Sequence, residues 1–475
     1  MSYLLEQKRL HETNWSLSYN YFSKIINKFK LKTGVEIGVA FGGHCEAILN
    51  KTKITKLYGI DAYQHRQTYR DVFNLPQEEF NRLFQYTSQR LRKFGRRFRL
   101  IRKTSQAAVK YIPDNLDFVY MDANHSFNGV LGDLSDWFFQ IKDGGIIGGH
   151  DYGHVNHPGV KKAVDQFFNR FHWPINLEPQ GVWWVQKQPL NVSFFIPAFN
   201  CQKTIKSTVD SIIKTNFQSK DELIIVNDGS TDKTHHQLKL LKQKYPFIKV
   251  INHQNNRGGG CTRNAAVDVA KHQFLFCLDA DNILAPKSIT KLKDFLIQSN
   301  ADVVSFQSLY YFKTSPQKTT HKWKFKPGLF TLSDALSGLK NPGSSGNYLF
   351  TKRSWIQAGG YPEFTGALDA WGFSMRQLFT GVRMIVMPKS YYYHRWGYDS
   401  YWVREARKGK MPLTALQTLL PYIHLLNPRD VNYIMSKKGR YNWFGNLKNH
   451  PIRLKKTPSK TWSRMKSAMK KFLSL

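Results

Sequence analysis

Two carboxylates stand one residue apart after a short apolar run. The segment FLFCLDADN, residues 274–282, is apolar up to Leu278 and then places Asp279 and Asp281 on either side of an alanine. If the strand continues through them, both side chains lie on one face. Two such carboxylates repel each other unless a cation lies between them, and Mg2+ or Mn2+ takes one or two carboxylates together with substrate phosphates. The spacing therefore predicts a site for a divalent metal and a diphosphate.

A second group of reactive side chains follows four apolar segments in the N-terminal half. The side chains are Glu36, Asp61, Asp122 with His125, and His150 with Asp151. Because the carboxyl ends of parallel strands meet at one edge of a sheet, we expect these groups to share a rim. A glycine-rich turn with Gly38 and Gly42 follows the first segment and lets backbone amides approach a ligand. An acid placed like Asp61 accepts hydrogen bonds from ribose hydroxyls.

The elements that must position these residues repeat a simple pattern. Both halves of the chain alternate short apolar runs with helical stretches, which predicts an α/β fold with parallel sheets covered by helices. A seam lies near residues 187–190, between GVWWVQ and NVSFFIPAFN. We therefore expect two α/β domains, residues 1–187 and 190–404, followed by a basic, partly helical tail, residues 405–475.

Composition narrows the class of protein. The chain has 475 residues, enough for two or three domains. It contains no apolar run of about 18 residues, and its start lacks the apolar core of a signal peptide. The four cysteines are scattered and form no CxxC pair, which argues against a disulfide framework and a zinc site. These features predict a cytoplasmic protein.

The net charge of +37 favours polyanionic partners, namely nucleic acid, anionic lipid or phosphorylated ligands, although a compositional bias explains it equally well. No nucleic-acid-binding signature occurs, so no specific nucleic acid binding is expected. In the tail, Trp462, Met465, Met469 and Phe472 have helical spacing opposite lysines. This helix either lies on the anionic cytoplasmic face of a membrane or docks on the protein's own core. Nothing in the sequence indicates an oligomeric state.

The N-terminal half resembles a known family over residues 15–187. The segments EIGVAFGG, GIDAY, DFVYMDANHSF and KDGGIIGGHDY are similar to those of class I S-adenosylmethionine-dependent methyltransferases, in particular small-molecule O-methyltransferases with D-x-x-H and GHDY motifs. The resemblance implies a Rossmann-like fold that binds S-adenosylmethionine. One residue departs from the pattern, because Ala40 stands where the loop usually has a third glycine.

The same resemblance implies roles for individual residues. Glu36, Gly38 and Gly42 would face the methionine part of the cofactor, and Asp61 its ribose. Asp122 and Asp151 would lie beside the acceptor as Mg2+ ligands, and His125 or His150 would be the general base.

The C-terminal half, from Val192 to about Arg404, resembles the family 2 glycosyltransferases, which have a GT-A fold. The matching segments are FFIPAFN, IIVNDGSTDKT, NNRGGGCTRNAA and FCLDADN. The resemblance implies that Pro197, Phe199 and Asp228 line the nucleobase site of a UDP-, GDP- or dTDP-linked sugar. It implies that Arg263 holds the donor region, that Asp279 holds ribose or metal, that Asp281 binds the metal, and that His394 completes the metal or diphosphate shell.

Such enzymes need a carboxylate that deprotonates the acceptor hydroxyl. Family members carry an acidic pair before a tryptophan-rich helix, and here the pair is reduced to Asp369 followed by Ala370. Asp369 is the predicted base, and Glu363 is the alternative.

Together these resemblances predict a bifunctional glycan-modifying enzyme. The second half would transfer a sugar from a nucleotide sugar to a glycan acceptor with inversion, using Mg2+ or Mn2+, and the first would methylate a sugar hydroxyl with S-adenosylmethionine. The alternative is a monofunctional glycosyltransferase whose first half is a non-catalytic module for acceptor binding or oligomerisation.

Overall fold

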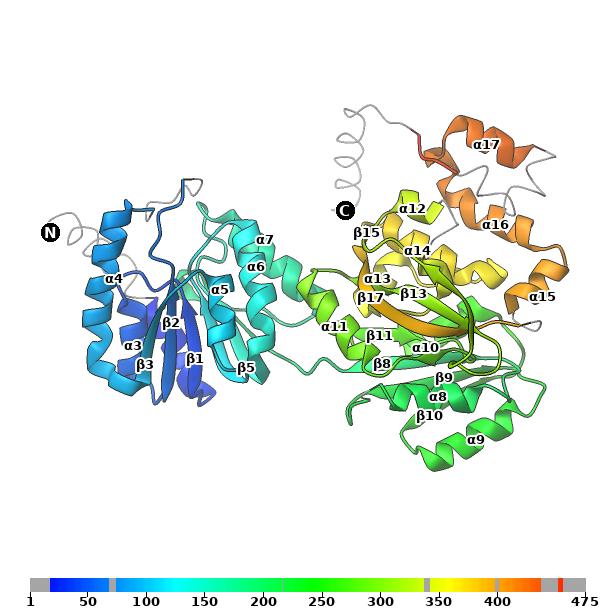
Figure 1. Ribbon diagram of the computed structural model, residues 1–475, viewed down its shortest axis with the longest axis horizontal. Helices are drawn as coiled ribbons and strands as arrows, with labels where there is room; N and C mark the ends of the chain where they lie inside the picture. Colours follow the sequence, from blue (N-terminus) through cyan, green and yellow to red (C-terminus); the bar gives the residue numbers. More distant parts are fainter. Residues whose placement is uncertain are drawn as a thin grey trace. The chain divides into compact units, whose positions relative to one another are not determined.

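The computed structural model describes residues 18–67, 74–215, 217–336, 342–397, 401–436 and 452–455 (Figure 1). The chain divides into two compact units, Met1–Leu190 and Asn191–Leu475, and each is described by itself. The predicted amphipathic helix around Trp462 lies outside the described residues.

Unit 1 contains a seven-stranded sheet in the order β3-β2-β1-β4-β5-β7-β6. Its strands are β1 (Thr33–Ile37), β2 (Lys56–Asp61), β3 (Phe98–Arg102), β4 (Leu116–Met121), β5 (Ile141–Gly149), β6 (Asn176–Glu178) and β7 (Val182–Gln186). The first five run parallel, and the strand order reverses between β1 and β4, which lie side by side. Ligands of such sheets bind at the carboxyl ends of the strands near this reversal.

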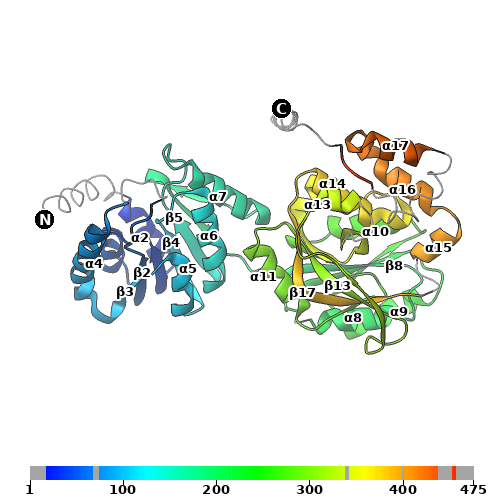
Figure 2. The same ribbon diagram turned by 45° about the horizontal axis from the view of Figure 1, so that its top comes forward.

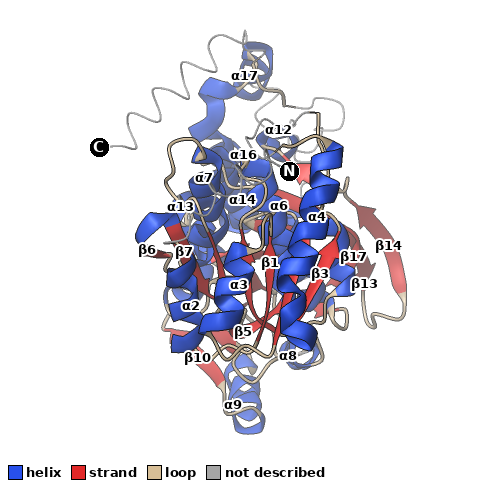
Figure 3. Ribbon diagram, turned by 90° about the vertical axis from the view of Figure 1, so that its left-hand side faces the viewer, coloured by secondary structure: helices blue, strands red, loops and turns tan. Residues whose placement is uncertain are grey.

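Helices cover both faces of this sheet. They are α2 (Tyr19–Lys28), α3 (Gly43–Lys51), α4 (Gln77–Leu91), α5 (Ser105–Ala108), α6 (Phe127–Trp137) and α7 (Pro158–Phe168). Figure 1 shows α3 and α4 on one side of the sheet and α5, α6 and α7 on the other, and in Figure 3 α2, α3 and α4 lie together in front of the strands. Phe22 of α2, Ile48 of α3 and Phe118 of β4 share one buried core. The helices thereby hold the strand ends in fixed positions.

Unit 2 contains a ten-stranded mixed sheet. Its main path runs β10-β9-β8-β11-β16-β13-β17-β12, with β14 paired to β13 and β15 to β17. The strands are β8 (Val192–Ala198), β9 (Glu222–Asp228), β10 (Ile248–His253), β11 (Phe274–Cys277), β12 (Ile283–Leu284), β13 (Val303–Phe312), β14 (Thr319–Lys324), β15 (Gly328–Phe330), β16 (Tyr348–Thr351) and β17 (Met384–Arg395). β8 to β11 run parallel, whereas β16 is antiparallel to both β11 and β13.

The helices of unit 2 are α8 (Ile205–Ile213), α9 (Thr234–Lys244), α10 (Gly259–Asp268), α11 (Ser288–Gln298), α12 (Leu332–Leu336), α13 (Lys352–Ala358), α14 (Asp369–Phe379), α15 (Tyr401–Arg407), α16 (Met411–Leu419) and α17 (Pro428–Met435). Figure 2 shows α8 and α9 on one side of the sheet and α10, α13 and α14 on the other. All four residues of β11 are buried, as expected for a strand covered on both faces. No helix among the described residues is long and apolar enough to cross a membrane.

Two details differ from the sequence-based expectation. The sheets are not wholly parallel: β6 and β7, for example, are joined by only three residues, Pro179–Gly181, and so short a connection can only join antiparallel strands. In addition, β11 ends at Cys277, so Asp279 and Asp281 lie in the turn before β12. The argument that alternation along a strand places both carboxylates on one face is therefore wrong. The turn places them instead. In it the backbone N–H of Asn282 donates a hydrogen bond to the backbone carbonyl of Asp279 at 3.0 Å.

Candidate functional site

The predicted rim of unit 1 surrounds a cavity of about 1090 Å³. The ends of β1, β2, β4 and β5 all contribute to its lining, through Glu36, Gly38, Asp61, Asp122, His125, His150 and Asp151. Gly38 is required where β1 meets β4, because a Cβ there would lie 1.9 Å from the backbone oxygen of Asp122. The cavity is large enough for a nucleoside cofactor.

Gly42 does not line this cavity. It has a φ of 77° and precedes α3, and a Cβ on it would lie 2.9 Å from Leu91. A glycine is therefore needed at position 42 for the turn and for the packing of α3 against α4. The position of Gly42 does not support the predicted contact with the methionine part of a cofactor.

Asp61 holds the loop that follows β1. Its carboxylate accepts hydrogen bonds from the backbone N–H groups of Val39 and Ala40 at 3.0 Å each and of Tyr63 at 2.8 Å. Burial raises the pKa of Asp61 although these three donors oppose the shift. Ala40 adopts a left-handed φ of 45°, and its carbonyl accepts from Tyr63 and Thr87. The loop can therefore keep an alanine where glycine is usual, because its neighbours hold the strained conformation.

Histidines and carboxylates gather at the ends of β4 and β5. His125 Nε2 lies 3.0 Å from Asp151 and 3.3 Å from Asp122, and His150 Nδ1 lies 3.1 Å from Asp151. Burial opposes ionisation of Asp151, yet His125 and His150 hold its pKa well below the usual range. Burial likewise opposes a charge on His150, but the bond to Asp151 raises the pKa of that ring.

The donor atoms are close enough to share a cation. Those of Asp122, His150 and Asp151 lie within 4.8 Å of one another, and so do those of His125, Asp151 and His157. Asp151 belongs to both groups and has a left-handed φ of 60°, a strained conformation typical of functional sites. His157 was missed in the sequence because it follows the strand end by several residues.

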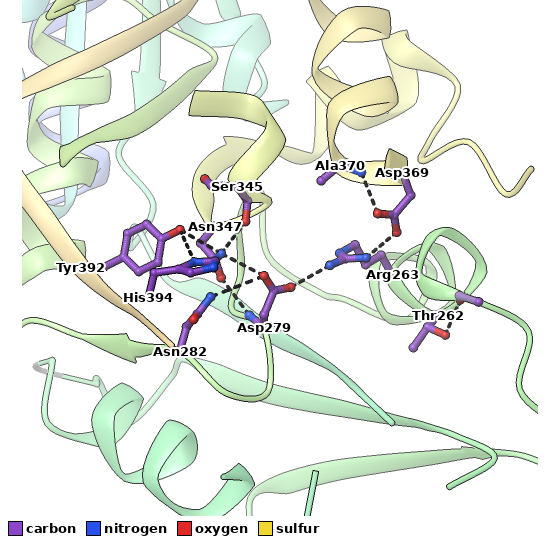
Figure 4. A network of polar contacts seen from close by, with 11 residues as sticks. Thr262, Arg263, Asp279, Asn282, Ser345, Asn347, Asp369, Ala370, Tyr392 and His394 are labelled. Carbon is purple, nitrogen blue, oxygen red and sulfur yellow. Dashed lines mark hydrogen bonds and ion pairs between the residues drawn. The ribbon is translucent and has the colours of Figure 1, made fainter. Parts of the chain in front are cut away.

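In unit 2, Arg263 of α10 joins two of the predicted site residues. Its guanidinium donates to Asp279 at 2.7 Å and to Asp369 through a short contact (Figure 4). Asp369, the first residue of α14, also accepts from the Ala370 amide at 2.7 Å. Burial raises the pKa of Asp369, and Arg263 opposes that shift. A Cβ on Gly259 would lie 2.5 Å from Asp369 and 2.6 Å from Arg263, so the glycine makes room for the pair.

Two asparagines fix Asp279 from its other side. Asn347 Nδ2 donates to the Asp279 carboxylate at 3.0 Å while its Oδ1 accepts from the Asp279 amide at 2.8 Å, and Asn282 donates at 3.5 Å. Asn347 also contacts the Tyr392 hydroxyl at 3.3 Å, which in turn lies 3.3 Å from His394 Nδ1. Burial lowers the pKa of His394 to about 4, so its ring is neutral at physiological pH and can act as a metal ligand.

Asp281 is the more available of the two carboxylates. Within the described parts of the chain, no side chain donates a hydrogen bond to its carboxylate, whereas its backbone carbonyl accepts from Arg395 at 3.1 Å. Burial and then the charge of Asp279 raise the pKa of Asp281 to about 7. Among the described residues, Asp279, Asp281 and His394 do not form a group of three donors within 4.8 Å. Their shared role at a metal stays a prediction.

The predicted nucleobase residues lie at the ends of β8 and β9. Asp228 accepts from the backbone amides of Arg257 and Gly258 at 2.9 Å each and lies 2.7 Å from His253, so it holds the loop before α10. Pro197 is half-buried in β8, and the half-buried ring of Phe199 lies 6.0 Å from the Arg404 guanidinium. Glu363, the alternative base, accepts from Asn264 at 3.0 Å.

Models of known protein families match one segment in each unit. Residues 32–152 match the model described as a methyltransferase domain, and residues 193–360 match glycosyl transferase family 2.

Curated relatives match over shorter segments. A poly(ribitol-phosphate) beta-glucosyltransferase of Bacillus spizizenii is 29% identical over 116 residues, which are 24% of this chain and 18% of that protein. The uncharacterised glycosyltransferase YibD of Escherichia coli is 27% identical over 136 residues, or 29% of this chain and 38% of its own. A poly-beta-1,6-N-acetyl-D-glucosamine synthase of Staphylococcus aureus is 32% identical over 93 residues, or 20% of this chain and 22% of its own. The chain thus spans well under half the length of these relatives.

Among solved structures, S. aureus TarS residues 1–349 in complex with UDP-GlcNAc is 20% identical, with a TM-score of 0.43 over 54% of this chain and 73% of that one.

The two family models match separate segments, one in each unit. The chain joins a methyltransferase-family domain, matched over residues 32–152, to a glycosyl transferase family 2 domain, matched over residues 193–360.

Proposed function

We propose that unit 2 transfers a sugar from a nucleotide-sugar donor to a glycan acceptor with inversion, and that Asp369 is the base. The observation that carries this proposal is the bridge from Asp279 through Arg263 to Asp369, which ties the end of β11 to the start of α14. A base needs a pKa closer to neutrality than that of an exposed carboxylate, and burial shifts the pKa of Asp369 in that direction. Relatives named for transfer to poly(ribitol phosphate) and for synthesis of a glucosamine polymer support a polymeric acceptor.

The residues present fit a divalent cation in part. Asp281 offers carboxylate oxygens, and His394 offers a neutral imidazole nitrogen. Asp279 is already engaged by Arg263 and Asn347, which favours a role in orienting the site over direct coordination. A bound Mg2+ or Mn2+ would neutralise charge on the leaving diphosphate. Asp369 would accept the proton of the acceptor hydroxyl, and Arg263 would hold its carboxylate in place.

A panel of UDP-, GDP- and dTDP-sugars incubated with the protein and Mn2+ tests the proposal. We expect hydrolysis or transfer of one donor, lost in Asp281→Asn and retained in Asp268→Asn, which changes an exposed carboxylate at the end of α10. Equal activity of both variants, or no turnover of any donor, would contradict the proposal.

We further propose that unit 1 binds S-adenosylmethionine and methylates a sugar hydroxyl. The cavity at the ends of β1, β2, β4 and β5 supports this proposal, with Glu36 and Gly38 on its wall. The His–Asp pairs supply a candidate base, His125 or His150, each in contact with Asp151. Because both ligand sets found among the described residues include imidazole, the cluster fits Mn2+ better than the predicted Mg2+.

Isothermal titration with S-adenosylmethionine and assay of methyl transfer to the unit 2 product test this second activity. Asp151→Asn should retain cofactor binding and lose methyl transfer, whereas Asp143→Asn, which changes an exposed carboxylate in β5, should keep both. Cofactor binding without methyl transfer in the wild-type chain would contradict the proposed methylation.

One observation favours the alternative, a non-catalytic first unit. Asp61, the residue expected to bind ribose, already accepts three backbone hydrogen bonds from Val39, Ala40 and Tyr63. A ribose would therefore have to share an acceptor that serves the fold. Under this alternative the titration with S-adenosylmethionine gives no heat, while sugar transfer persists.

Peripheral membrane contact through the basic tail also stays a proposal, and liposome flotation of the chain truncated after Ser436 would test it.

A further inference from the structure

A row of aromatic rings crosses one face of the sheet edge formed by β14, β13 and β17. Tyr311 of β13 lies 4.2 Å from His321 of β14, 5.8 Å from Trp323 and 4.8 Å from His394 of β17, measured between ring centroids. His321 in turn lies 5.4 Å from Trp396, just beyond β17. The pairing explains the arrangement, because Tyr311 stands opposite both His321 and His394 in register. We call Trp323, His321, Tyr311, His394 and Trp396 the aromatic row.

The aromatic row begins at the surface and ends at the candidate transfer site. Trp323 is 49% exposed and Trp396 is 38% exposed, and every residue of β14 is exposed at the sheet edge (Figure 3). At the other end, His394 contacts the Tyr392 hydroxyl, which contacts Asn347, the residue that holds Asp279. The row is therefore continuous with the network of Figure 4.

The chain around the aromatic row is strongly basic. Between Asp302 and Asp334 it has no acidic residue and contains Lys313, Lys318, Lys322, Lys324 and Lys326. The Lys313 ammonium lies 4.7 Å from the Trp396 ring. Lys322 and Lys324 alternate with His321 and Trp323 along β14, so they face the other side of the edge strand, where the Lys322 ammonium donates to the Tyr310 hydroxyl at 2.8 Å. Lysines on an edge strand oppose pairing with a second copy of the same strand, since like charges would meet. The combination favours an anionic partner over a second copy of the chain.

We propose that the aromatic row binds the acceptor, and that the acceptor is a glycan or polyol chain carrying phosphate or other anionic groups. The negative faces of the Trp323 and Trp396 rings suit the C–H faces of sugar or polyol units, and Lys313 together with the basic segment between Asp302 and Asp334 suits the anionic groups. This inference rests on the proposed sugar transfer, because it places the growing end of the chain at Asp279 and Asp281. Stacked rings with lysines also suit single-stranded nucleic acid, so that partner is an outcome of the test.

Affinity electrophoresis of the full chain tests the inference. The protein, with its net charge of +37, migrates toward the cathode through native gels containing poly(ribitol phosphate), neutral dextran or oligothymidylate. We expect retardation by poly(ribitol phosphate), with an apparent dissociation constant raised at least about fivefold in Trp323→Ala. Phe247→Ala, which removes a ring 48% exposed outside the row, should behave as the wild type.

A second pair of variants tests the charge. Lys313→Gln should weaken retardation, because its ammonium lies against the Trp396 ring, whereas Lys239→Gln, which removes the same charge from an exposed position of α9, should not. Trp323→Ala should also keep metal-dependent hydrolysis of the nucleotide sugar without acceptor. This readout separates a lost acceptor site from a damaged donor site.

Three results would overturn the inference. Trp323→Ala could be retarded as strongly as the wild type, or dextran or oligothymidylate could retard the wild type as strongly as the phosphate polymer. Light scattering could instead show that Trp323→Ala dissociates an oligomer, which would assign the row to a second copy. Failure of the proposed sugar transfer would give a different result. Neither the wild type nor any variant would then hydrolyse a nucleotide sugar, whatever the gels show.

Discussion

Replacing Arg263 by methionine tests whether its guanidinium maintains the charge state of Asp369. The change keeps most of the side-chain volume and removes both ionic contacts, to Asp369 and to Asp279. The side chains of Arg263 and Asp369 are only 10% and 5% exposed, so water cannot replace the lost partner. Breaking such a buried pair from one side costs about 3–5 kcal/mol. Protonation of Asp369 limits the loss, because a neutral carboxyl needs no counter-ion.

Because protonation of Asp369 reduces the loss of stability, the stability of the Arg263→Met variant depends on pH. Burial already raises the folded-state pKa of Asp369 above its unfolded value, and loss of Arg263 raises it further. A carboxyl whose pKa is higher in the folded state is stabilising when protonated and loses that contribution as the pH rises through the folded-state pKa. The deficit of Arg263→Met relative to the wild type should therefore be small at pH 5 and grow toward pH 8.5.

Scanning calorimetry of the full chain over this pH range measures the effect. At pH 8 the melting temperature of unit 2 should fall by roughly 6–20 °C. Arg376→Met is the matched control, because Arg376 lies in the same helix as Asp369 but donates to the backbone carbonyls of Gly359 and Gly360 at 3.0 and 3.2 Å. Its deficit should not vary with pH. If the deficit of Arg263→Met is equally constant, Arg263 does not control the protonation of Asp369.

Three further predictions concern single residues. Asp281→Asn should raise the melting temperature of the metal-free protein at pH 8 by several degrees and leave it nearly unchanged at pH 4, because the wild-type carboxyl has a pKa of about 7 and costs stability once charged. Asp61→Ala should cost about 3 kcal/mol or more in denaturant unfolding, since it leaves three backbone donors without their acceptor, and should abolish heat on titration with S-adenosylmethionine. Gly38→Ala should prevent folding of unit 1, as its Cβ would meet the Asp122 backbone, whereas Gly132→Ala in α6, with open space around it, should stabilise by about 1 kcal/mol.

Most of the architecture follows from local patterns in the sequence. Short apolar runs that end in acids predicted the parallel strands of both units, and parallel strands place their carboxyl ends at one edge whatever their order. Glu36, Asp61, Asp122 and Asp151 therefore line one cavity as expected. The family models that match residues 32–152 and 193–360 confirm the two predicted families.

The contacts that complete the sites depend on pairings that no local pattern specifies. Asn347 reaches Asp279 only because β16 lies antiparallel to β11, and its segment GNYLF resembles any other strand entry. Arg263 and Asp369 are 106 positions apart and meet because α10 and α14 lie on the same side of the sheet. The roles of Asp61 and Asp228 as holders of neighbouring loops were likewise hidden, since an acid at a strand end looks the same whether it binds a ligand or a backbone.

The reduced acidic pair also affects the charge of the unit 2 site. Asp279, Asp281 and Asp369 carry three negative charges at high pH, whereas Arg263 pairs with two of them and Arg395 acts on Asp281, so the three carboxylates outnumber the two arginines by one. A second acid at position 370 would lie beside Asp369, where Arg263 already divides its charge between two partners. Alanine there lets a single arginine hold both Asp279 and Asp369. Burial and then the charge of Asp279 raise the pKa of Asp281 to about 7, although Arg395 opposes the shift. Asp281 is thus the carboxylate that gains most from a cation, which makes it the residue at which metal dependence should be most evident.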